Sequence, residues 1–300
     1  MKLLGFLLIA LLGCVPSFAQ MNLEGEWAGR YHEDQADRVP GDVQGDFTGI
    51  PMNDAARRYA ESFDVRRVTL LEHQCQPYSL PHIFRGPMQF RIWAEKDPAT
   101  QEIIALRQFL GTYQQWRTIW MDGRPHPSKY AAHEKSGFTT GVWEDDVLVT
   151  YTTHMEAGAI RRNGVPSSDQ ATMTARFSRH DDVLTITARI DDPIYLTEPY
   201  YLTRSFRLAR APLNPATHPC TVTNEGVEAE RVPHYYPGQN PFLDELTKLY
   251  GIPQEAVLGG AETALPEFRK KIKDKYVRPS RCVSVPASTC GGPGTYPPID

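Results

Sequence analysis

The chain has 300 residues, with 36 acidic and 32 basic side chains and a formal net charge of −4. The two signs are interspersed, and no basic stripe of the kind that binds a phosphate backbone is present, which argues against nucleic acid as a partner. A chain of this length can bury a core of ordinary size in one large domain or two small ones.

The N-terminus has the pattern of a secretory signal. Lys2 precedes the apolar run 3–12, and small residues follow up to Ala19. We therefore predict a signal peptide over residues 1–19 and a periplasmic or secreted mature protein. The stretch Leu11-Leu12-Gly13-Cys14 also resembles a bacterial lipobox, which leaves open a lipid anchor at Cys14. No apolar run is long enough to predict a membrane span.

Four cysteines follow the signal: Cys75, Cys220, Cys282 and Cys290. An even number in an exported protein predicts disulfide bonds, and three pairings are open. The short separation of Cys282 and Cys290 favours a local bond between them, which leaves Cys75 to pair with Cys220. The cysteine and histidine spacings match no zinc motif, so no metal site is predicted.

Residues 20–210 have the pattern of a β-domain. A first strand is expected at 23–29, followed by a short helix at 54–63. Runs that alternate between apolar and polar residues, bounded by turn residues, then follow at 88–94, 102–110, 114–121, 141–153, 171–179, 183–190 and 200–208. Seven or eight antiparallel strands at this spacing predict a mainly β fold, either an antiparallel β-barrel or a strongly curved sheet.

The composition changes after residue 210. Residues 211–276 begin as a proline-rich linker, and helices are predicted only at 241–250 and 266–276. Two short helices bury too little surface to fold by themselves, so we predict a C-terminal wrap over the β-domain. Residues 277–300 are predicted to be a loosely ordered tail.

Gly25-Glu26-Trp27 in the first strand resembles the G-x-W mark of lipocalins and related calycin barrels. In those barrels the tryptophan closes the barrel floor and stacks on an arginine of a late strand. The resemblance implies a lipocalin-like barrel in which Arg207 or Arg210 covers Trp27. Gly141-Val142-Trp143 repeats the mark; we interpret it as an ordinary tryptophan at a strand start, with two barrel-like halves as the alternative.

A broader set of motifs covers most of the mature chain. The motifs are Cys75-Gln-Pro, Met121-Asp-Gly-Arg-Pro-His-Pro127, Gly141-Val-Trp-Glu-Asp-Asp-Val-Leu-Val149, Arg161-Arg-Asn-Gly164 with Ser168-Asp169, Tyr195-Leu-Thr-Glu-Pro199, and His234-Tyr-Tyr-Pro-Gly-Gln-Asn-Pro241 with Gly259-Gly-Ala-Glu-Thr263. Together they resemble an uncharacterised family of exported bacterial proteins, which implies a shared fold and export but no activity. Members of that family often carry a histidine where this chain has Phe138.

The stretch 122–127 places a carboxylate, a guanidinium and an imidazole where a strand meets a loop. His126 is a candidate general acid or base oriented by Asp122, and Arg124 is a candidate for binding an anion or polarising a carbonyl. The structural alternative is a turn stiffened by two prolines, in which Arg124 pairs with Asp122.

The strand that ends near Thr153 leads directly into the loop 160–169, so polar residues of both segments should share one end of the β-structure. The candidates are His154 and Glu156 for acid/base chemistry, and Arg161, Arg162, Asn163, Trp116, Trp120 and Tyr151 for binding a ligand in an aromatic pocket. The alternatives are a packed aromatic core and a loop folded by its own side chains, with one arginine paired to Asp169 or Glu156.

No nucleophile elbow, phosphate-binding loop, dinucleotide fingerprint or HExxH motif is present, which counts against covalent hydrolysis, and no cofactor is predicted. The leading hypothesis is an exported protein that binds a small apolar or aromatic molecule in a β-lined pocket. The first alternative is an enzyme that performs hydration, isomerisation or elimination on such a molecule by acid/base chemistry. The second is a structural envelope protein.

Overall fold

The computed structural model describes residues 21–30, 45–64, 74–82, 89–110, 115–161, 163–210, 221–222 and 234–275. The predicted signal peptide and C-terminal tail lie outside these ranges. Of the cysteines, Cys75 lies inside them, whereas Cys14, Cys220, Cys282 and Cys290 do not. The disulfide pairings, the lipid anchor and export therefore stay predictions.

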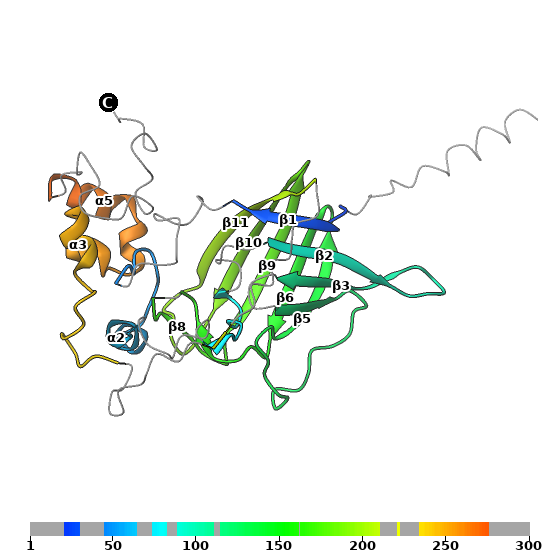
Figure 1. Ribbon diagram of the computed structural model, residues 1–300, viewed down its shortest axis with the longest axis horizontal. Helices are drawn as coiled ribbons and strands as arrows, with labels where there is room; N and C mark the ends of the chain where they lie inside the picture. The colour runs from blue at the N-terminus through cyan, green and yellow to red at the C-terminus, as the bar shows by residue number, and fades with distance from the viewer. Residues whose placement is uncertain are drawn as a thin grey trace, which may run out of the picture.

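Nine strands form a closed barrel, which confirms the predicted mainly β fold (Figure 1). Their order around the wall is β1-β11-β10-β9-β6-β5-β4-β3-β2. The bounds are β1 Gly25–Gly29, β2 Gln89–Lys96, β3 Ile103–Leu110, β4 Gln115–Trp120, β5 Phe138–Glu144, β6 Val147–Thr153, β9 Thr172–His180, β10 Val183–Asp191 and β11 Tyr200–Leu208. A separate two-stranded sheet pairs β7 (Gly158–Ala159) with β8 (Pro166–Ser167).

One pair of neighbouring strands departs from the predicted antiparallel order. β4 and β5 are parallel, with Ile119 opposite Thr139 and Trp120 opposite Thr140. The intervening residues 121–137 explain the direction, because a connection of this length lets the chain return and start the next strand from the same end. The barrel is therefore mixed, and this long connection carries several of the candidate residues across the outside of the wall.

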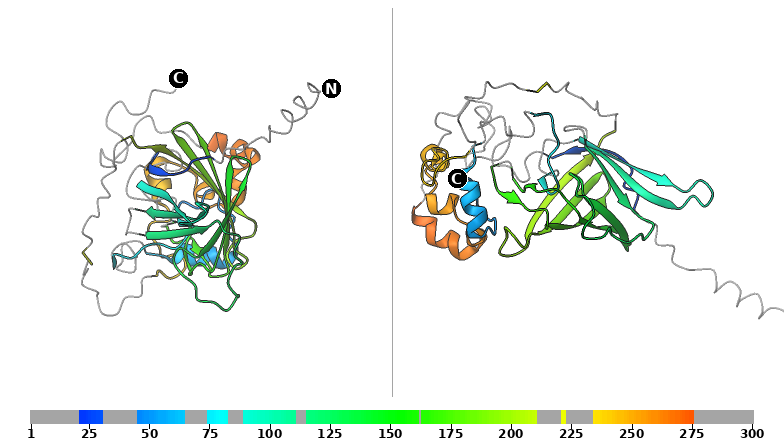
Figure 2. Two further views of the ribbon diagram at one scale, coloured as in Figure 1. Left: turned by 90° about the vertical axis from the view of Figure 1, so that its right-hand side faces the viewer. Right: turned by 90° about the horizontal axis from the view of Figure 1, so that it is seen from below.

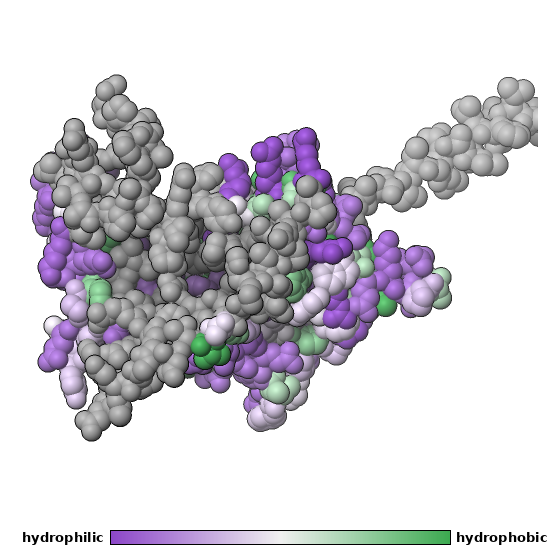
Figure 3. Space-filling model, in the orientation of Figure 1, coloured by the Kyte–Doolittle hydropathy of each residue, from purple (hydrophilic) through white to green (hydrophobic). Residues whose placement is uncertain are grey.

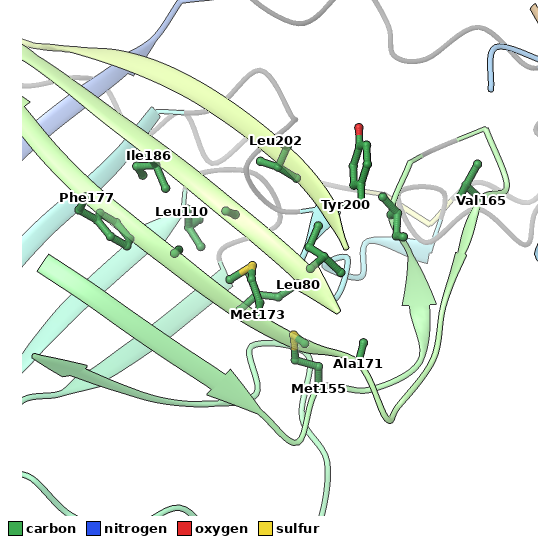
Figure 4. Packing of buried hydrophobic residues seen from close by; sticks show 14 of the residues in the cluster. Leu80, Leu110, Met155, Val165, Ala171, Met173, Phe177, Ile186, Tyr200 and Leu202 are labelled. Atoms are coloured by element: carbon green, nitrogen blue, oxygen red, sulfur yellow. The ribbon is translucent and has the colours of Figure 1, made fainter. Parts of the chain in front are cut away.

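Side chains alternate between the two faces of the wall, because successive residues of a strand point to opposite sides. On β9, Met173, Ala175 and Phe177 are buried, as the sequence predicted. Figure 4 shows Phe177 beside Ile186 of β10, and Met173 beside Leu80 further toward one end of the barrel. The hydrophobic core is therefore continuous from the barrel interior to the segments at that end, while the visible outer surface is mainly hydrophilic (Figure 3).

Trp27 of β1 is fully buried, and its Nε1 donates a hydrogen bond to the carbonyl of Leu23 at 3.0 Å. The guanidinium that covers its ring belongs to Arg179 of β9, at 5.3 Å from the ring centroid. An arginine of a late strand thus covers Trp27, but the prediction that it would be Arg207 or Arg210 was wrong. Trp27 pairs with Leu208, so Arg207, the neighbour of Leu208 along β11, points to the opposite face.

Helices lie beyond one end of the barrel (Figure 2). They are α2 Asp54–Ser62, α3 Glu245–Tyr250, α4 Gln254–Val257 and α5 Pro266–Ile272, with the 3-10 turns η4 Ala261–Ala264 and η5 Lys273–Lys275. The Asn53 side chain caps α2 by accepting hydrogen bonds from the backbone N–H groups of Ala55 and Ala56, each at 3.0 Å. The predicted helices are confirmed but shorter, and α4 was not predicted.

The segment 45–50 joins the C-terminal helices to the rest of the molecule. The Phe47 N–H donates to the carbonyl of Val257 at 2.9 Å, and the Gly49 N–H donates to Thr263 Oγ1 at 2.8 Å. The guanidinium of Arg57 in α2 donates to the carbonyl of Leu258. These contacts hold the C-terminal helices against α2 and the segment 45–50 instead of leaving them as a separate unit.

Candidate functional site

A polar cluster lies inside the barrel around Arg117 of β4. Arg117 and its cross-strand partner Gln108 of β3 face the same side, and both side chains are buried. The guanidinium donates hydrogen bonds to Gln108 Oε1 at 3.1 Å, Thr152 Oγ1 at 3.2 Å and Thr139 Oγ1 at 3.4 Å. Burial lowers the pKa of Arg117 to about 9, so the side chain is still protonated at neutral pH.

The side-chain amide of Gln108 is only half satisfied. Its oxygen accepts from Arg117, whereas its nitrogen is buried and has no hydrogen-bond partner among the residues that the structure describes. An unsatisfied buried donor costs about 1 to 3 kcal/mol. The N–H groups of Gln108 therefore mark a position inside the barrel where an oxygen acceptor would be stabilised.

Apolar side chains surround this polar cluster. The buried residues on the inner face of β2, β3 and β4 include Ile92, Leu106, Leu110 and Ile119. Arg204 of β11 is a second buried arginine inside the barrel. An interior with mainly apolar walls and a few polar groups is the usual composition of a small-molecule site.

A second cluster lies on the outer face of β5 and β6, where His126 packs against four residues. Phe138 pairs with Thr153 across the two strands, and Thr140 pairs with Tyr151. His126 Nε2 is 2.9 Å from Thr140 Oγ1, and Nδ1 is 2.8 Å from Thr153 Oγ1. The imidazole ring lies 5.1 Å from both the Phe138 and the Tyr151 rings. The predicted residues His126 and Tyr151 therefore lie together.

Thr153 connects His126 to His154. Thr153 Oγ1 lies 2.8 Å from His154 Nδ1, and His154 Nε2 lies 2.9 Å from the carbonyl oxygen of Ser128. A carbonyl oxygen only accepts, so His154 Nε2 carries the hydrogen and neutral His154 accepts at Nδ1 from the Thr153 hydroxyl. His126 Nδ1 then donates to Thr153. Burial and, to a lesser extent, the Coulombic repulsion that two protonated rings would exert between His154 and His126 lower the pKa of His126.

The backbone around His154 is unusual. Its φ is 56°, in the left-handed region that residues other than glycine seldom adopt. Glu134 donates its backbone N–H to the His154 carbonyl at 3.0 Å, and the His133 ring lies 5.3 Å from the His154 ring. The carboxylate of Glu156, another predicted acid/base residue, is paired with Lys135 at 2.9 Å.

Asp122 and Arg124 form an ion pair with each other. Arg124 Nε donates to both carboxylate oxygens of Asp122, at 2.9 and 3.0 Å, and this pairing lowers the pKa of Asp122. The guanidinium also lies 3.4 Å from the centroid of the Trp120 ring. Asp122 and Arg124 thus pair with each other, as expected if the stretch 122–127 is a structural turn. His126 bonds to Thr140 and Thr153 instead of Asp122.

The loop after β7 holds the barrel end to the segment 45–50. Arg161 Nη2 donates to the Tyr200 hydroxyl at 3.1 Å, and Arg161 Nη1 lies 3.8 Å from an Asp46 carboxylate oxygen. Asn163 is fully buried, and its Nδ2 donates to the Asp46 carbonyl at 2.6 Å. Arg162 lies outside the described residues.

The aromatic residues predicted to line a pocket lie on the outer face of the wall. Trp116 is 61% exposed and contacts Phe109 and Trp93 at ring distances of 4.8 and 5.7 Å. Trp120 lies under Arg124, and Tyr151 lies beside His126. The inner face of the same strands carries the Arg117 cluster instead.

Sequence reasoning missed Arg117, Gln108 and the four threonines. A signal was present, because in the run 115–120 glutamine and arginine alternate with tryptophan and threonine. From the alternation alone, either the face with Arg117 or the face with Trp116 could point into the barrel. We predicted that the tryptophans point inward because large apolar side chains are usually buried. The register with β3 puts Arg117 opposite Gln108 and Trp116 opposite Phe109, and the burial of Arg117 and Gln108 shows that theirs is the inner face.

No family model matches the chain, and no similar curated protein or solved structure was found. Within the described ranges, no group of three or more histidine, cysteine, aspartate or glutamate side chains could hold a metal ion. No helix in the described part of the chain has the length and hydrophobicity needed to cross a membrane.

Proposed function

We propose that the protein binds a small, mainly apolar molecule with a carboxylate or similar anionic group inside its barrel. The single observation that carries the proposal is the buried, protonated Arg117 beside the unsatisfied Gln108 amide nitrogen. A guanidinium binds a carboxylate through parallel, charge-assisted hydrogen bonds, and an amide N–H can add a further donor. The acidic group is thus the part of the ligand that Arg117 and Gln108 would recognise.

The energetics of burial support an anionic ligand. Removing a guanidinium from water costs several kcal/mol, and an opposite charge brought in by a ligand would help to offset that cost. The oxygens that accept from Arg117 in Gln108, Thr139 and Thr152 are all neutral. A bound carboxylate would add an opposite charge in surroundings where water screens it weakly.

The remainder of the ligand is proposed to be apolar because of the surrounding wall. Ile92, Leu110 and Ile119 are buried on the inner face near Arg117. Their contacts would stabilise a hydrocarbon chain or an aromatic ring by about 25 cal/mol for each Å² removed from water. A purely polar anion would gain none of this stabilisation.

The proposal is tested with ligands that differ only in the head group. Calorimetry on the purified, delipidated mature protein would compare dodecanoate with dodecanol, and phenylacetate with benzyl alcohol. We expect each acid to bind more tightly than its alcohol by about tenfold to a hundredfold, the scale of a hydrogen bond to a charged group. Native mass spectrometry of freshly purified protein should show a retained acid.

The matched variants are Arg117→Met and Arg176→Met. Both keep an apolar stem, but Arg176 lies on the outer face and pairs with Glu144 at 2.8 Å. Arg117→Met should remove the preference for acids, and Arg176→Met should preserve it. Equal affinities for acids and alcohols in the unaltered protein would contradict the proposal, and failure to bind any of these molecules would favour the structural alternative.

A further inference from the structure

The outer cluster, formed by His126, Thr153 and His154, has the chain of hydrogen bonds that activates a hydroxyl group as a nucleophile. The Thr153 hydroxyl donates to His154 Nδ1 at 2.8 Å, and His154 Nε2 donates to the Ser128 carbonyl at 2.9 Å. A nucleophile, a base within hydrogen-bond distance of it and a third group that orients the base are the elements of covalent acyl transfer. His126 Nδ1 adds a donor to Thr153 Oγ1 at 2.8 Å.

We infer that Thr153 is a nucleophile for acyl transfer from small apolar or aryl esters, with His154 as its general base. Ser128 fixes the tautomer of His154 through its carbonyl group, and His126 is a positioning residue whose N–H favours the deprotonated oxygen of Thr153. The site lies on the outer face of the barrel wall. It is independent of the ligand proposed for Arg117 and goes beyond that proposal.

The reaction balances with water as the only co-reactant. Thr153 Oγ1 attacks the ester carbonyl carbon as its proton passes to His154 Nδ1, and the ester C–O bond breaks as that proton passes to the departing alkoxide or aryloxide. Water then attacks the acyl-threonine while His154 takes a proton from it. The acid leaves when that proton returns to Thr153 Oγ1, so the net reaction is ester plus water to acid plus alcohol.

Two further observations point to function at this position. His154 holds a left-handed backbone conformation with φ 56°, and residues other than glycine in that region often lie at functional sites. The rings of Phe138 and Tyr151 flank His126, and Tyr151 is 44% exposed. An aromatic surface beside the hydroxyl would favour an ester with an aryl or apolar group.

The test uses 4-nitrophenyl acetate with the full mature chain. Release of 4-nitrophenolate gives the rate of acylation, and peptide mass mapping after an acid quench locates the acetyl group. We expect the acetyl group on Thr153. Thr153→Ser should retain labelling, because the hydroxyl remains, and Thr153→Val should abolish it. His154→Asn, which tolerates the left-handed backbone, should slow release roughly a hundredfold or more.

Matched controls separate this chemistry from general reactivity. His180 on the outside has a side chain that is 96% exposed, and Thr203 carries an exposed hydroxyl on β11. His180→Gln and Thr203→Val should leave the rate unchanged. Circular dichroism checks that every variant is folded. If Thr153→Val does not fold, the position of the acetyl group in the unaltered protein tests the inference instead. Acetylation of other residues while Thr153 stays unlabelled would overturn it.

Discussion

Adjacent threonines of β6 serve opposite faces of the barrel wall. Thr152 points inward and accepts a hydrogen bond from the buried, protonated Arg117, whereas Thr153 points outward and bonds to His126. The same alternation holds at residues 139–140 of β5. The hydroxyl chemistry is identical at the two faces. What each hydroxyl contributes is set by the charge of its partner and by its distance from water.

The largest expected effect comes from removing the inner hydroxyl. Thr152→Val should lower the free energy of unfolding by about 1.5 to 3 kcal/mol, because a buried charged donor loses an acceptor. Thr153→Val should cost less than about 1 kcal/mol, since its hydroxyl is partly exposed and bonds to neutral groups. Urea denaturation of both variants measures the difference, and equal losses would refute the distinction between the faces.

A double-mutant cycle tests whether Arg117 causes the larger loss. In an Arg117→Met background, Thr152→Val should cost less than about 1 kcal/mol, because no charged donor remains to be satisfied. Arg117→Met by itself leaves Gln108 Oε1 buried without this donor, so it should also lower the free energy of unfolding, by about 1 to 3 kcal/mol. If Thr152→Val remains as costly in that background, its hydroxyl acts through a contact other than Arg117.

High pH should weaken the binding of acids at Arg117 but not the binding of alcohols. Burial lowers the pKa of Arg117 to about 9, and only the protonated guanidinium attracts a carboxylate. The affinity for dodecanoate should therefore be constant below pH 9 and fall about tenfold for each pH unit above it. Dodecanol affinity should not change, which serves as the control. A flat profile for dodecanoate up to pH 10.5 would show that the acid does not contact this guanidinium.

The smallest expected effect is the acid sensitivity of the outer cluster. The pKa of His126 is lowered from its ordinary 6.5, mainly by burial. Below pH 6.5 the unfolded chain therefore binds more protons at this residue than the folded protein, so stability should decrease as pH falls toward the folded pKa. The drop in melting temperature between pH 7.5 and pH 5.5 should be smaller in His126→Gln than in the unaltered protein. An unchanged difference would assign the acid sensitivity to other groups.

The mainly β fold could be predicted because its signals are local. Met173, Ala175 and Phe177 lie on one face of β9 and are buried, as their spacing of two residues requires. Turn residues between the runs placed hairpins such as the one between β9 and β10, where Asp181 has φ 52°. The parallel pairing of β4 and β5 could not be predicted, since no local pattern reports the path of the connection 121–137.

For the candidate sites too, some features could be predicted from the sequence and others only from the tertiary structure. The sequence by itself identified the titratable and charged side chains in the stretches 122–127 and 153–156, and it determined that neighbours on a strand face opposite sides. Only the tertiary structure decided that the inner face of β4 is that of Arg117, that Asp122 pairs with Arg124, and that Thr153 lies between two histidines. The physical reason is that strand register and closure depend on contacts between residues far apart in the chain, whereas alternation and turn formation depend on near neighbours.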